Sequence, residues 1–185
     1  MYKIVHYLFS MDNKTLLLKQ KRKIFSIDDL SLIWGVENRN TLRVTIRRYI
    51  QNNTLVRIRR GLYSIIPLNE LDPFLFGSSY IKGFCYISLQ TILEINGFIN
   101  QSVQLITLIG GRSQEFKLNK QRYICKKMKP EYLHNIEGID LTGEHPVASA
   151  ERAVADMLYF NSRFHFDAKN RIDWNKVKNI KDKVF

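Results

Sequence analysis

Apolar residues recur at helical spacing in two neighbouring stretches near the N-terminus. The first, residues 27–34, follows Ser26, whose hydroxyl can accept a free N–H of a first helical turn, and it is followed by Gly35. The second stretch, within residues 38–53, carries apolar side chains at positions i, i+4, i+7 and i+8, namely Leu42, Ile46, Tyr49 and Ile50. We therefore predict two short helices separated by a short break.

The second predicted helix has a basic side as well as an apolar one. Either Asn38 or Asn40 can cap its start. Arginines follow at i, i+4 and i+8, with a fourth beside them: Arg39, Arg43, Arg47 and Arg48. Arginine faces are usually solvated surface, but a planar guanidinium can also bind guanine edges and phosphates through two hydrogen bonds.

A β-hairpin is predicted directly after this helix. Residues 55–58 alternate as a strand, residues 59–61 form a turn whose glycine can adopt a positive φ, and residues 62–65 return as a second strand. Upstream, residues 4–21 are mostly helix formers and predict one helix, or two interrupted near residues 11–13. The order of short helix, break, arginine-faced helix and basic hairpin predicts an N-terminal winged helix-turn-helix.

The rest of the chain predicts a small α/β domain, so that the whole protein is α+β. Prolines, a glycine and serines mark residues 67–79 as a linker between a domain at 1–66 and a domain at 80–185. In the second domain, Ser88 can cap a helix that Gly97 ends. Further predicted elements are a buried strand at 103–109, strands at 115–118 and 121–127, and a helix within residues 147–160.

Positive charge is concentrated in the first domain. The 185 residues include 29 Lys and Arg against 17 Asp and Glu, a net charge of +12. Residues 1–66 hold 13 basic and 4 acidic side chains, residues 67–160 hold 9 and 10, and residues 161–185 hold 7 and 3. An excess of this size favours a polyanionic partner, and its distribution indicates that the first domain is the binding module.

The scattered cysteines and histidines exclude several other classes of protein. Cys85 and Cys125 stand alone and no two histidines have ligand spacing, so neither a disulfide framework nor a zinc site is predicted. No apolar run approaches the ~20 residues that cross a bilayer, and no cleavage site follows the apolar N-terminus. We expect a cytoplasmic protein with no metal, no cofactor and no membrane partner.

Two groups of residues resemble catalytic sites, but ordinary structure explains each of them. The turn at residues 110–112 lacks the Lys and Ser or Thr of a phosphate-binding loop. Arg152 and Asp156 have the i, i+4 spacing of a helical ion pair, and Glu151 suits the start of the same helix. We therefore predict that the protein is not an enzyme.

The predicted binding residues lie on the arginine-faced helix and on the hairpin, and the expected partner is double-stranded DNA. Those expected to face base edges are Asn40, Thr41, Arg43, Val44 and Arg47. Those expected mainly to hold phosphates are Arg39, Arg48, Arg57, Arg59 and Arg60.

Four segments together resemble a known family. RRGLYSI, YISLQTILEINGF, ITLIGGR and HPVASAERAVADML occur in this order within residues 25–160. In combination they resemble the AbiEi-type antitoxins of type IV toxin–antitoxin systems, also described as abortive-infection transcriptional regulators. The resemblance implies a winged helix that represses its own operon and a second domain that counters a nucleotidyltransferase toxin, without a stable complex. An inverted repeat in the promoter is the expected target, which implies two copies of the domain.

Two other functions remain open at this point. The protein can be a regulator that binds the toxin or an RNA, without sequence-specific DNA binding. It can also be an enzyme such as a nuclease subunit, although no carboxylates are paired at metal-binding spacing. The basic helix and hairpin favour a DNA-binding antitoxin over both.

Overall fold

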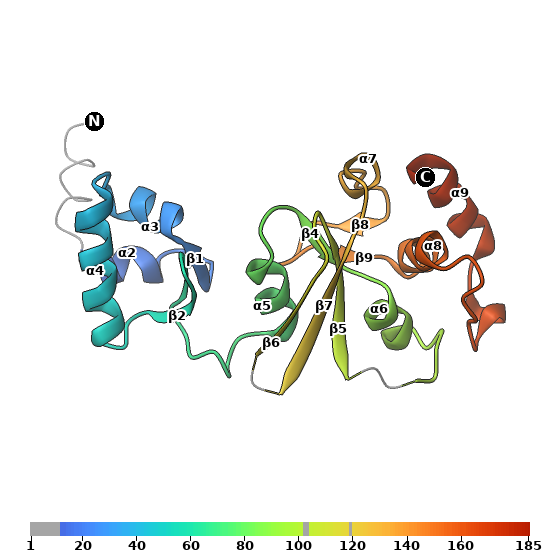
Figure 1. Ribbon diagram of the computed structural model, residues 1–185, viewed down its shortest axis with the longest axis horizontal. Helices are drawn as coiled ribbons and strands as arrows, with labels where there is room; N and C mark the ends of the chain where they lie inside the picture. Colours follow the sequence, from blue (N-terminus) through green and yellow to red (C-terminus); the bar gives the residue numbers. More distant parts are fainter. Residues whose placement is uncertain (1–11, 102–103, 119) are drawn as a thin grey trace. The chain divides into compact units, whose positions relative to one another are not determined.

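The computed structural model describes residues 12–101, 104–118 and 120–185. The chain divides into two compact units, with the boundary between Leu71 and Asp72. We call the N-terminal one unit 1 and the C-terminal one unit 2. Each unit contains helices and a β-sheet, so the protein is α+β (Figure 1).

Unit 1 packs helices against a small antiparallel sheet. Its described elements are α2 (Asn13–Leu18), β1 (Ile24–Ser26), α3 (Ile27–Trp34), α4 (Arg39–Gln51), β2 (Val56–Arg59) and β3 (Leu62–Ser64). β3 lies between β1 and β2, so Ser64 pairs with Ile24 on one side and with Val56 on the other. The helices predicted at 27–34 and within 38–53 and both hairpin strands are confirmed, although β2 is shifted by one residue and includes Arg59, a residue of the predicted turn. Of the helical stretch predicted at 4–21, the part before residue 12 lies outside the described residues.

The helix ends of unit 1 follow from local hydrogen bonds. The Ser26 hydroxyl accepts the Asp29 N–H at 3.1 Å, and Asp29 Oδ2 accepts the Ser26 N–H at 2.7 Å, which forms a capping box at the start of α3. Gly35 ends α3 with a φ of +63°. Asn38, one of the two predicted candidates, caps α4, since its Oδ1 accepts two N–H groups of the first turn at 2.9 and 3.1 Å.

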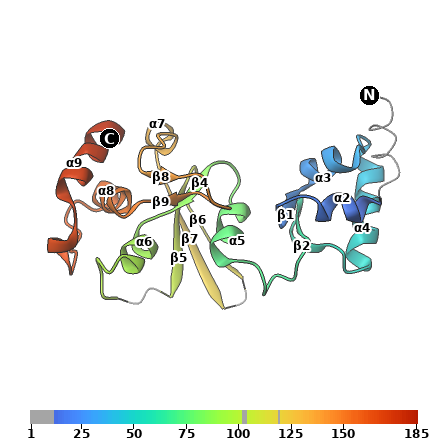
Figure 2. The same ribbon diagram turned by 180° about the vertical axis from the view of Figure 1, so that it is seen from behind.

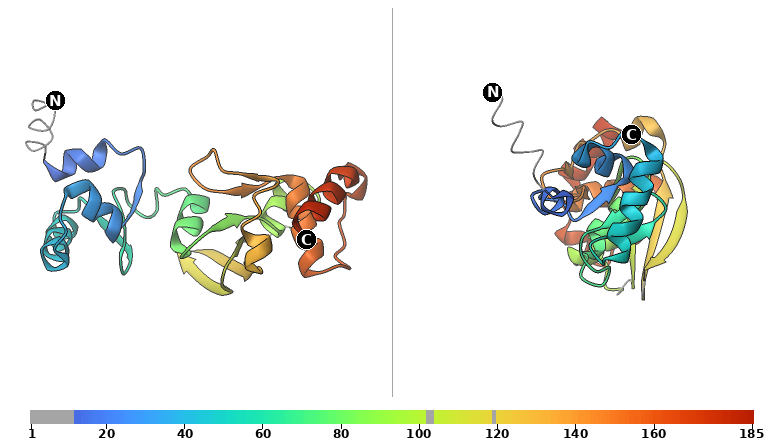
Figure 3. Two further views of the ribbon diagram at one scale, coloured as in Figure 1. Left: turned by 90° about the horizontal axis from the view of Figure 1, so that it is seen from above. Right: turned by 90° about the vertical axis from the view of Figure 1, so that its left-hand side faces the viewer.

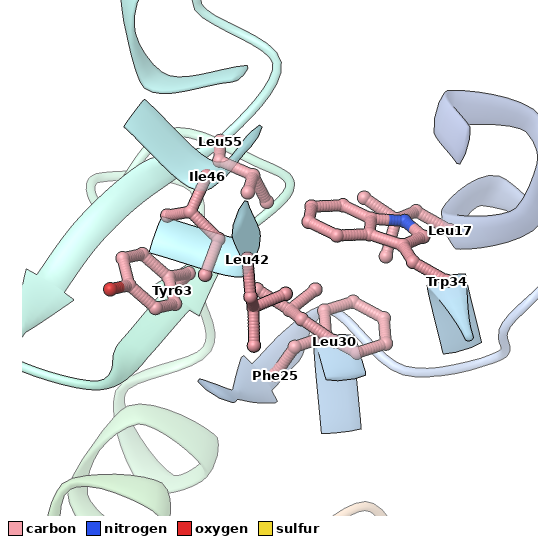
Figure 4. Close-up of a cluster of buried hydrophobic side chains, with 8 residues drawn as sticks. All are labelled: Leu17, Phe25, Leu30, Trp34, Leu42, Ile46, Leu55 and Tyr63. Atoms are coloured by element: carbon pink, nitrogen blue, oxygen red, sulfur yellow. The ribbon is translucent and has the colours of Figure 1, made fainter. Parts of the chain in front are cut away.

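One hydrophobic core joins the helices of unit 1 to its sheet (Figure 4). The buried cluster consists of Leu17, Phe25, Leu30, Trp34, Leu42, Ile46, Leu55 and Tyr63. The Trp34 indole N–H donates to the Asn13 carbonyl at 3.1 Å, which fastens α2 to α3. Leu42 and Ile46 are 0% and 3% exposed, so the core determines which side of α4 faces inward.

Unit 2 is built on a mixed six-stranded sheet of order β6-β7-β5-β4-β9-β8. Its elements are α5 (Pro73–Tyr80), β4 (Cys85–Ile87), α6 (Gln90–Ile95), β5 (Leu105–Gly110), β6 (Gln114–Leu118), β7 (Gln121–Lys127), α7 (Pro130–Leu133), β8 (Ile139–Asp140), β9 (Val147–Ala148), α8 (Ala150–Phe160), a 3-10 turn (Lys169–Arg171) and α9 (Trp174–Val184). The pairs β5–β7 and β4–β9 are parallel, and the other neighbours are antiparallel. Figures 1 and 2 show α5 on one face of the sheet and α6 and α8 on the other. α9 packs beside α8 (Figure 3).

The segment predicted to be a linker, residues 67–79, contains the start of α5. Asp72 Oδ1 accepts the Leu75 N–H at 2.8 Å, and a proline occupies the first helical position. The glycine of this segment permits a close approach to the sheet, because a Cβ on Gly77 would lie 2.9 Å from carbons of the Tyr123 ring. Residues that resemble a loop by composition therefore serve as a helix start and a packing contact.

The prediction that Ser88 caps a helix is wrong. Leu89 occupies the N-cap position of α6 with a φ of +59°, and no side chain of α6 caps it. Thr107 Oγ1 of β5 instead accepts the Thr91 N–H at 3.0 Å. The Ser88 hydroxyl donates to Asp156 Oδ2 at 2.7 Å, because a fully buried carboxylate requires hydrogen-bond donors.

A buried ion pair connects α8 to β4 and to the segment between α7 and β8. Arg152 Nε and Asp156 Oδ1 are 2.9 Å apart, and both side chains are 0% exposed. The Tyr86 hydroxyl accepts from Arg152 Nη2 at 3.0 Å and donates to Asp156 Oδ1 at 3.3 Å. Arg152 Nη1 also donates to the carbonyls of Asn135 and Glu137, at 3.0 and 2.7 Å. The i, i+4 pair predicted from the sequence is present, and it lies in the core.

Gly110, the last residue of β5, lies between the two cysteines. A Cβ at this position would be 2.9 Å from Cys125 Sγ and 3.3 Å from Cys85 Cβ. Both thiols are free and buried. Burial raises the pKa of Cys85 to about 12, with a contribution from Cys125, and that of Cys125 to about 11. The thiols therefore stay protonated and unreactive at neutral pH.

We expect the substitution Arg152→Met to destabilise unit 2 by about 3–5 kcal/mol, because it leaves the buried Asp156 carboxylate without its partner. Hydrogen–deuterium exchange measured by mass spectrometry locates the effect. Amides of β4 and α8 should exchange faster, while those of α4 in unit 1 keep the wild-type rate. Arg163→Met, at an exposed arginine of the same unit, serves as the control. Wild-type protection of β4 and α8 in Arg152→Met would contradict the structural role of the pair.

Candidate nucleic-acid interface

All ten residues predicted to bind DNA lie among the described residues of unit 1. Seven belong to α4, namely Arg39, Asn40, Thr41, Arg43, Val44, Arg47 and Arg48. The other three, Arg57, Arg59 and Arg60, belong to the β2–β3 hairpin. Every one of them is exposed except Arg59, which is half-buried. The residues of α4 that pack in the core are therefore different from those predicted to bind DNA.

Arg39 differs from the other arginines of α4. Its Nη2 lies 2.6 Å from Oδ1 of Asp28, in the first turn of α3. The two side chains are 53% and 69% exposed, so the pair contributes only about 0–1 kcal/mol to stability. The pair nevertheless places this guanidinium next to α3, so Arg39 is less available than the other arginines to bind an anion.

Most of the other arginines of these two elements lack such a partner in the described part of the chain. No ion pair with any residue that the structure describes is found for Arg43, Arg47, Arg48, Arg57 and Arg60. The second carboxylate at the start of α3, Asp29, is engaged in its helix cap. We call Arg43, Arg47, Arg48, Arg57 and Arg60 the exposed arginines of unit 1. Their positive charge is not neutralised within the described part of the unit.

The β2–β3 hairpin is attached to the start of α3. Gly61 turns the hairpin with a φ of +79°, and its carbonyl accepts the Ile27 N–H at 3.0 Å. The strand register shifts between Arg57 and Arg59, which indicates a bulge. Arg59 Nη1 donates to the Arg60 carbonyl at 3.3 Å. The basic turn is therefore held by a backbone hydrogen bond to the start of α3.

Val44 is the one residue of the predicted set with an apolar side chain. It is 61% exposed. On a helix with 3.6 residues per turn it lies on the side opposite to Leu42 and Ile46, so it takes no part in the core. Asn40 lies one turn before it and Arg47 one turn after it.

Sequence reasoning missed the extent of the buried polar cluster in unit 2. No local pattern connects Tyr86 and Ser88 with Arg152 and Asp156, because 64 or more residues separate the two segments. A usable signal was present in α8, where the pair is flanked by apolar residues on all sides of the helix: Ala153, Val154, Ala155 and Met157. A helix of this kind is buried all round, so charged residues within it are buried with it.

No model of a protein family matches the chain, and no curated protein is significantly similar to it in sequence. Among the described residues, no group of three or more His, Cys, Asp and Glu side chains could hold a metal ion. No helix in this part of the chain is both long and apolar enough to span a membrane. The function is therefore inferred from the exposed arginines and from the elements that present them.

The capping box of α3 makes the stability of unit 1 depend on pH. Burial raises the pKa of Asp29, but hydrogen bonds from Ser26 and the nearby Arg22 guanidinium outweigh it and hold the pKa below 3.8. A depressed folded-state pKa means that the carboxylate stabilises the fold above pH 3.8 and that this contribution is lost as the pH falls through the folded value. We therefore expect Asp29→Asn to be less stable than the wild type at pH 7, and the difference to shrink at pH values below 3.8.

Urea unfolding followed by Trp34 fluorescence measures this difference, in a Trp174→Phe background that removes the emission of unit 2. Asp28→Asn is the matched control, since its exposed pair should change stability little at any pH. A difference between wild type and Asp29→Asn that stays constant down to pH 2 would rule out the assigned role of the carboxylate.

Proposed function

We propose that unit 1 is a winged helix-turn-helix that binds double-stranded DNA. α3, the turn that follows Gly35, and α4 correspond to the helix-turn-helix, and the β2–β3 hairpin corresponds to the wing. The sheet order β1-β3-β2 and the position of the hairpin directly after α4 support this assignment. The more specific fold that we propose is therefore a winged helix followed by a small α/β domain.

The observation that carries the proposal is the set of exposed arginines of unit 1. They lie on one helix and one hairpin, and none of the five has an ion-pair partner among the described residues. A helix with its side chains is about 10–12 Å across, and the major groove of B-DNA is about 12 Å wide, so α4 fits the groove. Unneutralised guanidinium groups gain affinity for phosphates because binding releases the counterions of the DNA.

The ten predicted residues then have two kinds of role. Asn40, Thr41, Arg43, Val44 and Arg47 would face base edges, since they lie on the exposed side of α4. Arg48 and the hairpin residues Arg57, Arg59 and Arg60 would hold phosphates. Arg39 would join this second group only after its pair with Asp28 opens.

We further propose that the protein is the antitoxin of a type IV toxin–antitoxin system. The four segments that resemble AbiEi-type antitoxins support this part of the proposal. The protein would repress its own operon by binding inverted repeats as two copies, and unit 2 would counter a nucleotidyltransferase toxin without a stable complex. Such a regulator would act in the cytoplasm, together with the DNA that it binds.

The decisive experiment is binding of the full chain to a labelled fragment from upstream of its own gene, compared with a scrambled fragment, over a salt series. Preference for the upstream fragment is expected, with a log–log salt slope of about −0.9 for each phosphate neutralised. Equal and weak binding to both fragments would contradict the repressor function. Restored growth on coexpression with a nucleotidyltransferase toxin tests the antitoxin part separately.

We expect Arg43→Ala and Arg47→Ala to lose sequence preference before they lose nonspecific binding. Each removed base contact should cost about 1–3 kcal/mol at one position of the site, while the phosphate contacts remain. Competition binding with upstream and scrambled fragments measures both quantities. Arg163→Ala, at an exposed arginine of unit 2, is the control. If both α4 variants keep the wild-type preference, α4 is not the helix that reads the bases.

A further inference from the structure

The exposed side of α4 has an apolar residue at its centre. Successive residues of an α-helix are about 100° apart, so Val44 points away from the side that buries Leu42 and Ile46. Its side chain is 61% exposed and belongs to no part of the core of unit 1. Stability of the unit therefore gives no reason for an apolar, β-branched side chain at this position.

Val44 lies among polar side chains that suit base edges. Asn40 precedes it by one turn, and Arg47 and Arg48 follow it by one turn, positions that are neighbours on a helix surface. In the major groove, Asn binds adenine and Arg binds guanine, each through two hydrogen bonds. The apolar group that a base pair presents in this groove is the C5-methyl of thymine. Val44 is complementary to that group.

Position distinguishes Val44 from an ordinary exposed apolar residue. Single apolar side chains on a surface are common, and Leu32 of α3, which is 83% exposed, is one of them. Val44, in contrast, lies on the helix that carries Arg43 and Arg47, which form no ion pair with the part of the chain that the structure describes. The adjacent Thr45 has a local role, since its hydroxyl donates to the Thr41 carbonyl at 3.0 Å. Val44 is thus the apolar side chain at the centre of the exposed side of α4 that is available to contact a base.

We propose that Val44 contacts the C5-methyl group of a thymine in the major groove, next to base pairs contacted by Asn40 and Arg47. This inference rests on the proposed DNA binding of unit 1 and specifies what that site recognises. From Asn40 to Arg47 the helix rises about 10 Å at 1.5 Å per residue, and stacked bases are about 3.4 Å apart. The three side chains therefore span about three base pairs, one of which is T·A.

Replacement of thymine by uracil tests the contact, because it removes the methyl group and keeps the base pair. The full chain first selects its preferred sites from a pool of random double-stranded DNA, and each thymine of the selected site is then replaced in turn. For the wild type, one replacement should weaken binding about fourfold, the effect of one buried methyl-sized group. Val44→Ala should bind the thymine and uracil forms of that site equally.

The variants are expected to fold, since Val44 is exposed and alanine favours helices. Leu32→Ala is the matched control and should keep the wild-type sensitivity to uracil. A wild type that tolerates uracil at every position overturns the inference while DNA binding stands. Equal sensitivity in Val44→Ala also overturns it, because another residue then contacts the methyl group. Failure to select any sequence would instead refute the proposed function itself.

Discussion

The burial of Leu42 and Ile46 decides which side of α4 is exposed. These two side chains are 0% and 3% exposed, and the core that receives them is shared by α2, α3 and two strands of the sheet. Rotation of α4 by the angle between successive residues, about 100°, would carry Arg43 toward that core and expose Leu42. The cost of burying an unpaired guanidinium excludes this rotation. The exposed side of α4, with its arginines and Val44, is therefore fixed by packing on the opposite side.

A buried charge organises unit 2 in a different way. The guanidinium of Arg152 binds a carboxylate, a phenol hydroxyl and backbone carbonyls of the irregular segment between α7 and β8. An irregular backbone inside a protein needs donors for its carbonyl groups, and arginine supplies five N–H groups in one plane. The same segment binds the last helix, since Asn135 Nδ2 donates to the Lys183 carbonyl at 2.8 Å. The Arg152 side chain thus connects α8 with β4 and with the segment between α7 and β8, and that segment in turn binds α9.

The two units show why the count of basic residues is an incomplete guide to function. Arg152 is one of the 29 Lys and Arg residues, but its charge is buried and offset by Asp156, so it adds little to the field outside the protein. Arg43 and Arg47 carry the same charge on an exposed helix without a described partner. Long-range attraction of a polyanion depends on arginines of the second kind. Arg39, tied to Asp28 in an exposed and weak pair, lies between these two cases.

Local sequence determined the helix ends of unit 1 and the apolar and basic sides of α4. Ser26, Asp29 and Gly35 act within one turn of backbone, so their roles can be read without knowledge of the rest of the chain. The periodicity of residues 39–51 predicted both sides of α4 for the same reason. Tertiary structure alone decided that Ser88 serves a buried carboxylate and that Arg39 binds α3. Ser88 and Asp156 are 68 residues apart, and hydrogen-bond partners at that separation are chosen by the packing of α8 on the sheet rather than by neighbouring residues.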